Sequence, residues 1–146
     1  MGVTVYRFDD AGAPTLSAAA GALISVLDAC LVNGYGAKPA AGWTKAFSAT
    51  NQAAYRQGAG STGCYLRVDA TVARTNPLVR GYVTMSDINT GTYPFPTTVQ
   101  SNAASMCVAQ YVDVQAHPWL LAADSKRFYL WVGYNLTTAS GLDRKS

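Results

Sequence analysis

The sequence WLLAADSKRFYLWV, at residues 119–132, carries the strongest β signal in the chain. Two apolar arms, Trp119–Ala123 and Phe128–Val132, flank the polar turn Asp124–Arg127, which is the pattern of a β-hairpin. Neither arm alternates apolar with polar residues, as a strand with one solvated face would, because successive side chains point to opposite faces. We therefore expect the hairpin to be buried on both faces. A helix would cover one face, and another sheet layer or a second subunit would cover the other.

That helix is predicted between Pro14 and Gly34. Ser17 is a suitable N-cap after Pro14, and Asn33-Gly34 supplies a left-handed stop. Between these signals, apolar residues recur at the spacing of one helix face: Leu16, Ala20, Leu23, Ile24, Leu27 and Leu31. The pattern predicts an amphipathic helix packed on one side.

Short strands and loops are predicted between the helix and the hairpin. Residues 34–42 contain three glycines and a proline, which favour a loop, and Ile88–Pro96 is also predicted to be a loop because it holds a Thr-Gly pair and two prolines. Runs rich in aromatic and branched residues predict strands: Trp43–Phe47, Ala54–Gln57, Cys64–Asp69 and Leu78–Met85. The fold class is therefore predicted to be α+β, with one amphipathic helix packed on a mostly antiparallel sheet or small β-sandwich.

The composition is typical of a single domain that binds other proteins. A length of 146 residues is enough for a single core. We expect one structural domain over residues 1–146, with residues 133–146 forming a flexible or partner-bound tail. The hydrophobic fraction is 49% and the charged fraction 13%, whereas globular chains carry about 25% charged residues. A surface with so few charges is either sticky or covered by a partner, and we favour the partner.

Neither nucleic acid nor membrane is expected as a partner. The net charge is +3, and the basic residues are scattered singly or in close pairs such as Lys126 with Arg127. Nucleic-acid-binding surfaces gather such residues on one face. No apolar stretch approaches the roughly 20 residues that span a bilayer, and Met1–Asp10 lacks the basic and apolar regions of a secretory leader.

Candidate catalytic and cofactor motifs are weak. Gly58–Gly63 matches the dinucleotide-binding glycine pattern, but a strand pattern follows where the mechanism needs a helix, so we interpret it as a hairpin loop. His117 is the only histidine and precedes a proline at the entry to a strand; we expect a turn residue. Asp9-Asp10 is interpreted as a solvated turn. All eight acids are aspartates, which removes the common glutamate acid–base group. We expect no enzyme activity, no cofactor and no metal.

The cysteines and aromatic residues point to packing. Three widely spaced cysteines fit buried small residues, with one disulfide pair left open. Nine tyrosines stand beside four phenylalanines and three tryptophans, and tyrosine is enriched at protein interfaces. Tyr55-Arg56 and Tyr65-Leu66-Arg67 fit base stacking and ordinary sheet faces equally well. Aromatic residues in loops are our candidate contacts: Tyr35, Trp43, Tyr93 and Phe95.

Several segments of the chain carry a resemblance to a known family. The most specific is the run from Leu27 to Lys45, which includes Leu27-Asp28-Ala29-Cys30-Leu31-Val32-Asn33-Gly34-Tyr35-Gly36 and Lys38-Pro39-Ala40-Ala41-Gly42-Trp43-Thr44-Lys45. Others are Tyr6-Arg7 with Asp10 and Ala13-Pro14, Asn51 to Gly60, Arg80-Gly81-Tyr82, Thr90-Gly91 with Pro94-Phe95-Pro96, and His117-Pro118-Trp119 through Phe128-Tyr129-Leu130. With these segments the chain resembles a family of virion structural proteins of tailed bacteriophages.

The resemblance implies a structural component located in the virion. Its partners would be copies of itself, as a homo-oligomer, and other virion proteins. Head decoration or cement is the first expected role, and a neck or tail accessory protein is the next. The alternative function is a receptor-binding module at the phage tail that recognises a host surface glycan or protein.

Overall fold

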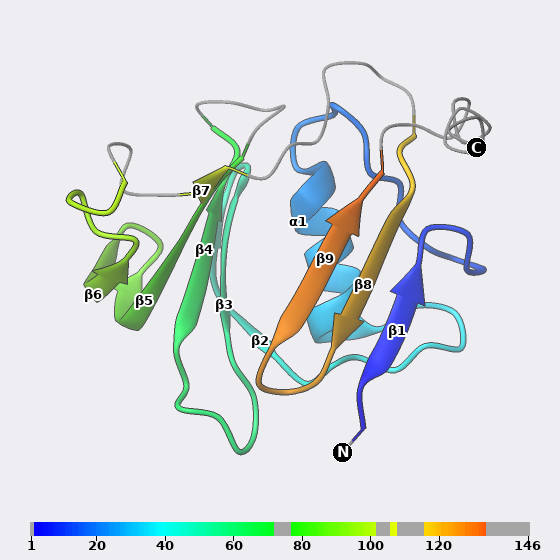
Figure 1. Ribbon diagram of the computed structural model, residues 1–146, viewed down its shortest axis with the longest axis horizontal. Helices are drawn as coiled ribbons and strands as arrows, with labels where there is room; N and C mark the ends of the chain where they lie inside the picture. The colour runs from blue at the N-terminus through cyan, green and yellow to red at the C-terminus, as the bar shows by residue number, and fades with distance from the viewer. Residues whose placement is uncertain (1, 72–76, 102–105, 108–115, 134–146) are drawn as a thin grey trace, which may run out of the picture.

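The computed structural model describes residues 2–71, 77–101, 106–107 and 116–133. These residues form two antiparallel sheets and one short helix, an α+β fold dominated by sheet (Figure 1). The predicted fold class is confirmed. The predicted tail lies outside the described residues apart from its first residue, Gly133. The helical segments are α1 Ala22–Leu27 and η1 Asp28–Asn33, and the strands are β1 Thr4–Arg7, β2 Thr44–Ala49, β3 Gln52–Arg56, β4 Tyr65–Asp69, β5 Leu78–Asp87, β6 Thr90–Phe95, β7 Met106–Cys107, β8 Trp119–Ala123 and β9 Phe128–Val132.

The smaller sheet has the order β1-β8-β9 and contains the predicted hairpin with both arms as predicted. Asp124 closes its turn, because its backbone N–H bonds to Arg127 O at 3.0 Å and its Oδ1 accepts the N–H groups of Lys126 and Arg127. Strand β1 adds antiparallel to β8, with Tyr6 opposite Leu121. The first strand of the chain and the last described hairpin are thereby joined in one sheet.

The helix begins later than predicted. Gly21 precedes Ala22 with φ 79°, a left-handed conformation that favours glycine and interrupts a right-handed helix. Ser17 caps no helix; its Oγ accepts the N–H of Ala19 in a preceding turn, at 3.2 Å. Leu16 is buried but forms a β-bridge to His117. The predicted end is confirmed, because η1, a π-helical continuation of α1, stops at Asn33 before Gly34.

The larger sheet has the order β2-β3-β4-β5-β6, and β7 pairs with β5. The four predicted strands are present as β2 to β5, with ends shifted by one or two residues. The predicted loop over Ile88–Pro96 is wrong: Thr90–Phe95 forms β6, paired with β5. Proline is tolerated there because β6 is an edge strand, where a missing N–H costs no ladder bond.

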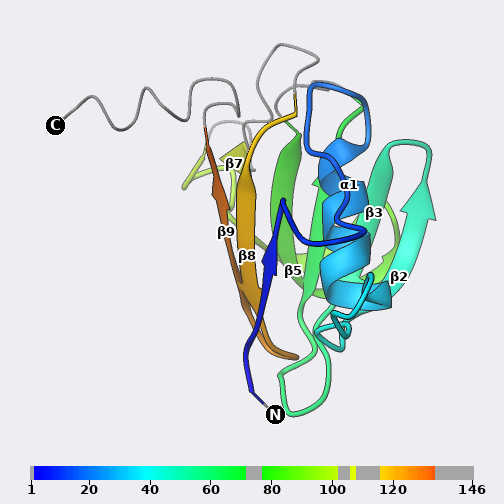
Figure 2. The same cartoon turned by 90° about the vertical axis from the view of Figure 1, so that its right-hand side faces the viewer.

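The core lies between the helix and the two sheets. Figure 2 shows α1 with the β1–β8–β9 sheet on one side and strands β2 and β3 on the other. The predicted stripe is buried from Leu23 to Leu31, and one cluster joins it to residues of both sheets: Tyr6, Ala53, Tyr55, Val68, Val79, Trp119 and Leu121. The short helix therefore contacts the inner face of each sheet.

A buried tyrosine ties the helix to the larger sheet. The Tyr55 hydroxyl on β3 donates to Asp28 Oδ1 at 2.7 Å and lies 3.2 Å from Ile24 O. Burial first, and then the Asp28 carboxylate, raise the pKa of Tyr55 well above its ordinary value, so the hydroxyl remains a donor. Lys45 pairs with the other Asp28 oxygen at 2.9 Å. Asp28 thus joins η1 to both β2 and β3.

Leu27 tests the packing of the helix. It is 1% exposed, in the middle of the buried stripe. We expect Leu27→Ala to lower the free energy of unfolding by about 2–5 kcal/mol, because it leaves a cavity between two sheets. Urea denaturation of this variant beside Val99→Ala, at a site 94% exposed, provides the measurement and its control. A loss under about 0.5 kcal/mol, as at an exposed site, would contradict the packing.

The Tyr55 hydroxyl tests the link between helix and sheet. Tyr55→Phe keeps the ring but leaves Asp28 Oδ1 without this donor, so we expect a loss of about 1–3 kcal/mol in the free energy of unfolding. Tyr129→Phe is the matched control, since Tyr129 is 56% exposed and its hydroxyl can bond to water. Equal losses for the two variants, measured by denaturation, would show that the Asp28 contact adds no stability.

Candidate interaction surface

The face of the smaller sheet that is turned away from the helix is apolar and exposed. Figure 1 looks onto this face, with the helix behind it. In β8 and β9 the side chains alternate between the core and solvent, so the predicted burial of both faces is wrong for the chain by itself. We call this surface the outer face and define it by the exposed residues Val5, Leu120, Tyr129 and Trp131, together with Arg7 and the half-buried Ala122.

Strand register arranges the outer face in two rows. Residues directly opposite one another in a sheet point to the same side. The pairing of β8 with its two neighbours therefore aligns Val5–Ala122–Tyr129 in one row and Arg7–Leu120–Trp131 in the next. The apolar side chains are thus contiguous across all three strands.

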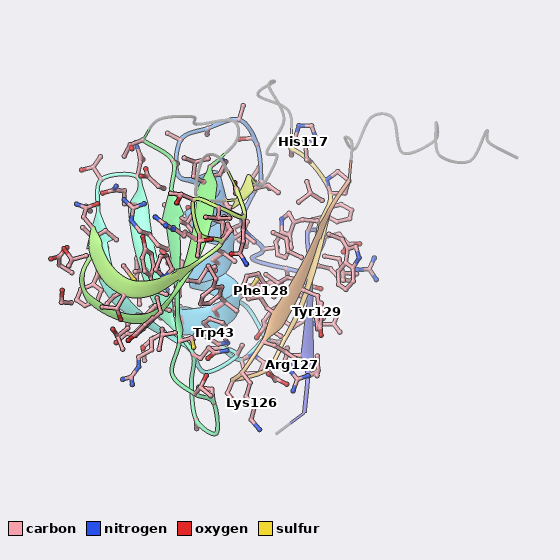
Figure 3. The ribbon with its side chains drawn as sticks, turned by 60° about the vertical axis from the view of Figure 1, so that its left-hand side comes forward. Trp43, His117, Lys126, Arg127, Phe128 and Tyr129 are labelled. Carbon is pink, nitrogen blue, oxygen red and sulfur yellow. The ribbon has the colours of Figure 1, made fainter. Side chains whose placement is uncertain are left out.

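Two aromatic rings dominate the outer face. Tyr129 is 56% exposed and Trp131 is 55% exposed. Their ring centroids are 6.2 Å apart with the planes inclined by 28°, a stacked arrangement. In Figure 3, Tyr129 points away from the molecule, whereas Phe128 on the same strand points toward Trp43 and the core. The two rings therefore present a broad apolar platform with polar tips.

A pocket adjoins the Trp131 end of the platform. Its volume is about 230 Å³, and Arg7, Phe8, Pro118 and Trp131 are among the residues that line it. Arg7 supplies the only charge in the two rows, and Asp9 pairs with it at 2.9 Å. Both side chains are about half exposed, so water screens this ion pair and it contributes little to stability. The surface is therefore apolar at its centre with one charged margin.

The predicted aromatic contacts lie elsewhere. Trp43 is 7% exposed; its ring packs edge-on against Phe128, and its Nε1 donates to Asp124 O at 2.8 Å. Tyr35 is half-buried and donates to Asp10 Oδ2 at 2.8 Å. Only Tyr93 and Phe95, both on β6, expose large areas. The four residues do not form one surface, and the outer face was missed because its residues belong to strands, not loops.

The glycine run at 58–63 lies in the loop between β3 and β4, as predicted. It is docked on the turn of the hairpin: the Gly58 N–H donates to Ser125 O at 2.7 Å, and Ser125 Oγ donates to Ala59 O at 2.8 Å. A Cβ at Gly58 would collide with the carbonyl oxygen of Gly42. Gly58 therefore permits close packing of the β3–β4 loop against Gly42 and against Ser125 in the turn of the hairpin.

The histidine, aspartate and cysteine residues considered as candidates take part in the packing and hydrogen bonding of the fold. His117 is 2% exposed and pairs with Leu16 through its backbone. Asp10 accepts the Arg7 N–H in a turn; burial favours a raised pKa for its carboxyl, but the bonds from Arg7 and Tyr35, with Lys38 nearby, lower that pKa overall. Cys30 and Cys64 are free thiols, and burial, assisted by the Asp10 charge, raises the pKa of Cys30 to about 12. The side chain of Cys107 lies outside the described residues.

Among residues 2–71, 77–101, 106–107 and 116–133, no set of three histidine, cysteine or acidic side chains is close enough to hold a metal ion. No helix in these ranges has the length and apolar character needed to cross a bilayer.

Comparison of the chain with protein-family models, with curated proteins and with solved structures finds no match.

Trp131 gives the outer face a spectroscopic signature. Trp43 and Trp119 are 7% and 2% exposed, whereas Trp131 is 55% exposed. We expect iodide to quench one component of the tryptophan fluorescence in the free protein, and Trp131→Phe to remove that component. Quenching that survives Trp131→Phe unchanged would place the accessible indole elsewhere and contradict the exposed platform.

Proposed function

We propose that the chain is a non-enzymatic structural component of a tailed-phage virion and that it binds neighbouring virion proteins through its outer face. Head decoration or cement is the first location, and a neck or tail accessory role is the second. The observation that carries the proposal is the contiguous apolar surface formed by Leu120, Tyr129, Trp131 and Val5.

Physical chemistry favours a protein partner for such a surface. Large exposed apolar patches on soluble proteins mark interaction sites, because covering them yields about 25 cal/mol per Å² before the costs of association. Tryptophan and tyrosine are the residue types that most often dominate binding energy at interfaces. Tyr129 and Trp131 are both more than half exposed and adjacent, so they would anchor the contact.

The resemblance to virion structural proteins supports the same location. Two of its segments, Tyr6-Arg7 and the run from His117 to Leu130, contribute residues to all three strands of the smaller sheet. A protein that is repeated on a particle needs a face that is complementary to its neighbours, and this sheet offers one. The sequence features that suggest the virion and the surface that suggests assembly therefore coincide.

Uptake onto phage particles that lack this protein tests the proposal. We expect the purified chain to bind such particles with an affinity that changes by no more than roughly threefold between low and high salt, because salt screens charges and not apolar burial. The double variant Tyr129→Ser/Trp131→Ser should bind roughly a hundredfold more weakly, because each anchor contributes on the order of 1–2 kcal/mol.

Tyr93→Ser is the matched control, since Tyr93 is 76% exposed on the other sheet. Loss of uptake with Tyr93→Ser but not with the double variant would place the contact on β6 and refute the role of the outer face. No uptake of the wild-type chain onto such particles would refute the virion assignment.

Recognition of a host-surface glycan is a second candidate, favoured by the same aromatic pair. Stacked rings 6.2 Å apart offer a flat apolar platform on which sugar rings can lie. A glycan array separates the two functions: specific binding that is lost with Trp131→Ala would favour the receptor-binding module, whereas a blank array together with particle uptake would favour assembly.

A further inference from the structure

A cleft lies between the two sheets, on the side where β9 faces the larger sheet. Its volume is about 110 Å³, and its walls include Trp43, Leu66, Phe95 and Phe128. We call this space the aromatic cleft. No residue of α1 or η1 lines it. The cleft is therefore a part of the space between the sheets that the short helix leaves unfilled.

Strand register builds the wall that the larger sheet contributes. Tyr55, Leu66, Gly81 and Phe95 stand opposite one another on β3 to β6. Opposite residues point to the same side, and Tyr55 is in the core, so this row continues the inner face of the sheet. A Cβ at Gly81 would collide with the Phe95 ring. Glycine at this position therefore lets the ring of an edge-strand residue fold back over the sheet.

The facing wall comes from Trp43, which precedes β2, and from Phe128 on β9. Their ring centroids are 5.7 Å apart and the planes are inclined by 73°, an edge-on contact. Figure 3 shows Phe128 turned toward Trp43. The hydrogen bond from Trp43 Nε1 to Asp124 O fixes the indole in place. This wall is thus aromatic and already ordered without a ligand.

The cleft is uncharged and opens to solvent on one side. Phe95 is 46% exposed and Cys64, another lining residue, is half-buried. Gln57 also lines the cleft, but its Oε1 accepts the Cys64 N–H at 3.0 Å and its Nε2 donates to Lys126 O. Both ends of this amide are therefore already bonded within the protein. The surroundings favour an apolar ligand whose polar substituent stays in water.

We propose that the aromatic cleft binds an uncharged small molecule that carries one aromatic ring. Apolar cavities of about 150 Å³ bind benzene, and this cleft is of similar size and need not enclose the ring completely. Contacts between aromatic rings favour such a ligand over a saturated ring of the same size. The inference does not rest on the virion proposal, because the purified chain alone is sufficient to test it.

Phenol is a suitable ligand for the test, since its hydroxyl can remain in water. We expect the chain to bind phenol in an NMR titration with a Kd on the order of 1 mM, in keeping with so small a ligand. Cyclohexanol, the saturated counterpart, should bind roughly threefold or more weakly, because it lacks the aromatic contacts. Phe95→Ala removes part of one wall and should weaken phenol binding by about tenfold.

Tyr93→Ala is the matched control. Tyr93 lies on the same strand, is 76% exposed and does not line the cleft. Its replacement should leave the phenol affinity unchanged. Trp131→Phe should also leave it unchanged, because Trp131 belongs to the outer face of the other sheet. This second control separates the aromatic cleft from the surface proposed for assembly.

Cys64 reports occupancy of the cleft in the unmodified chain. We expect iodoacetamide to alkylate Cys64, as located by peptide mass spectrometry, whereas Cys30 is 0% exposed. Phenol at ten times its Kd should slow alkylation of Cys64 roughly tenfold, because about one molecule in eleven then remains unoccupied. Glutathione in the same phenol solution controls for any effect on the reagent. This measurement stands even if Phe95→Ala fails to fold.

The proposal is overturned if phenol does not bind at about tenfold above the expected Kd. Binding that leaves the alkylation rate of Cys64 unchanged, or that Phe95→Ala and Tyr93→Ala weaken equally, would place the ring outside the cleft. Equal affinity for cyclohexanol would remove the aromatic specificity. Particle uptake without phenol binding would leave the virion assignment standing, so the two proposals fail separately.

Discussion

One short helix has to serve as the inner cover of two sheets, and the rest of the architecture follows from that constraint. The two helical segments have six residues each, which is enough to contact the inner faces of both sheets but leaves nothing for the outer ones. Leu23 to Leu31 fill the space between the sheets, and Asp28 anchors this segment to Tyr55. The larger sheet exposes Val83 on β5 and Tyr93 and Phe95 on its edge strand β6. The smaller sheet presents Tyr129 and Trp131 on its outer face.

Local signals were sufficient for the hairpin and for most strands. A polar turn between two apolar arms predicted β8 and β9 with their observed limits, because turn chemistry and strand pattern are encoded within the same fourteen residues. The start of the helix was not predictable from its apolar spacing. Leu16 fits the stripe, but Gly21 adopts a left-handed conformation and Leu16 pairs with His117, about a hundred residues away. Strand β6 was missed because Pro94 within it is acceptable only at an edge, and edge position is a property of the whole sheet.

The outer face also could not be predicted from local sequence, because its exposure depends on how the helix and the two sheets are arranged. The run Phe128–Val132 is apolar at every position, which is typical of a strand buried on both faces. The sequence does not state how many layers are available to bury it. Strand alternation would have placed Tyr129 and Trp131 on one side and Leu130 on the other, but only the arrangement of the helix shows which side is covered. Aromatic residues in loops were predicted as contacts because loops are usually exposed. Trp43, at the end of a loop, is instead buried and packs against Phe128.

A single three-stranded face is small beside the roughly 1,200–2,000 Å² buried in stable interfaces. The contact proposed for the outer face would therefore be weak for one copy by itself. Most of its binding energy would come from burial of Tyr129 and Trp131, because Arg7 and Asp9 at the margin are half exposed and their charges are screened by water.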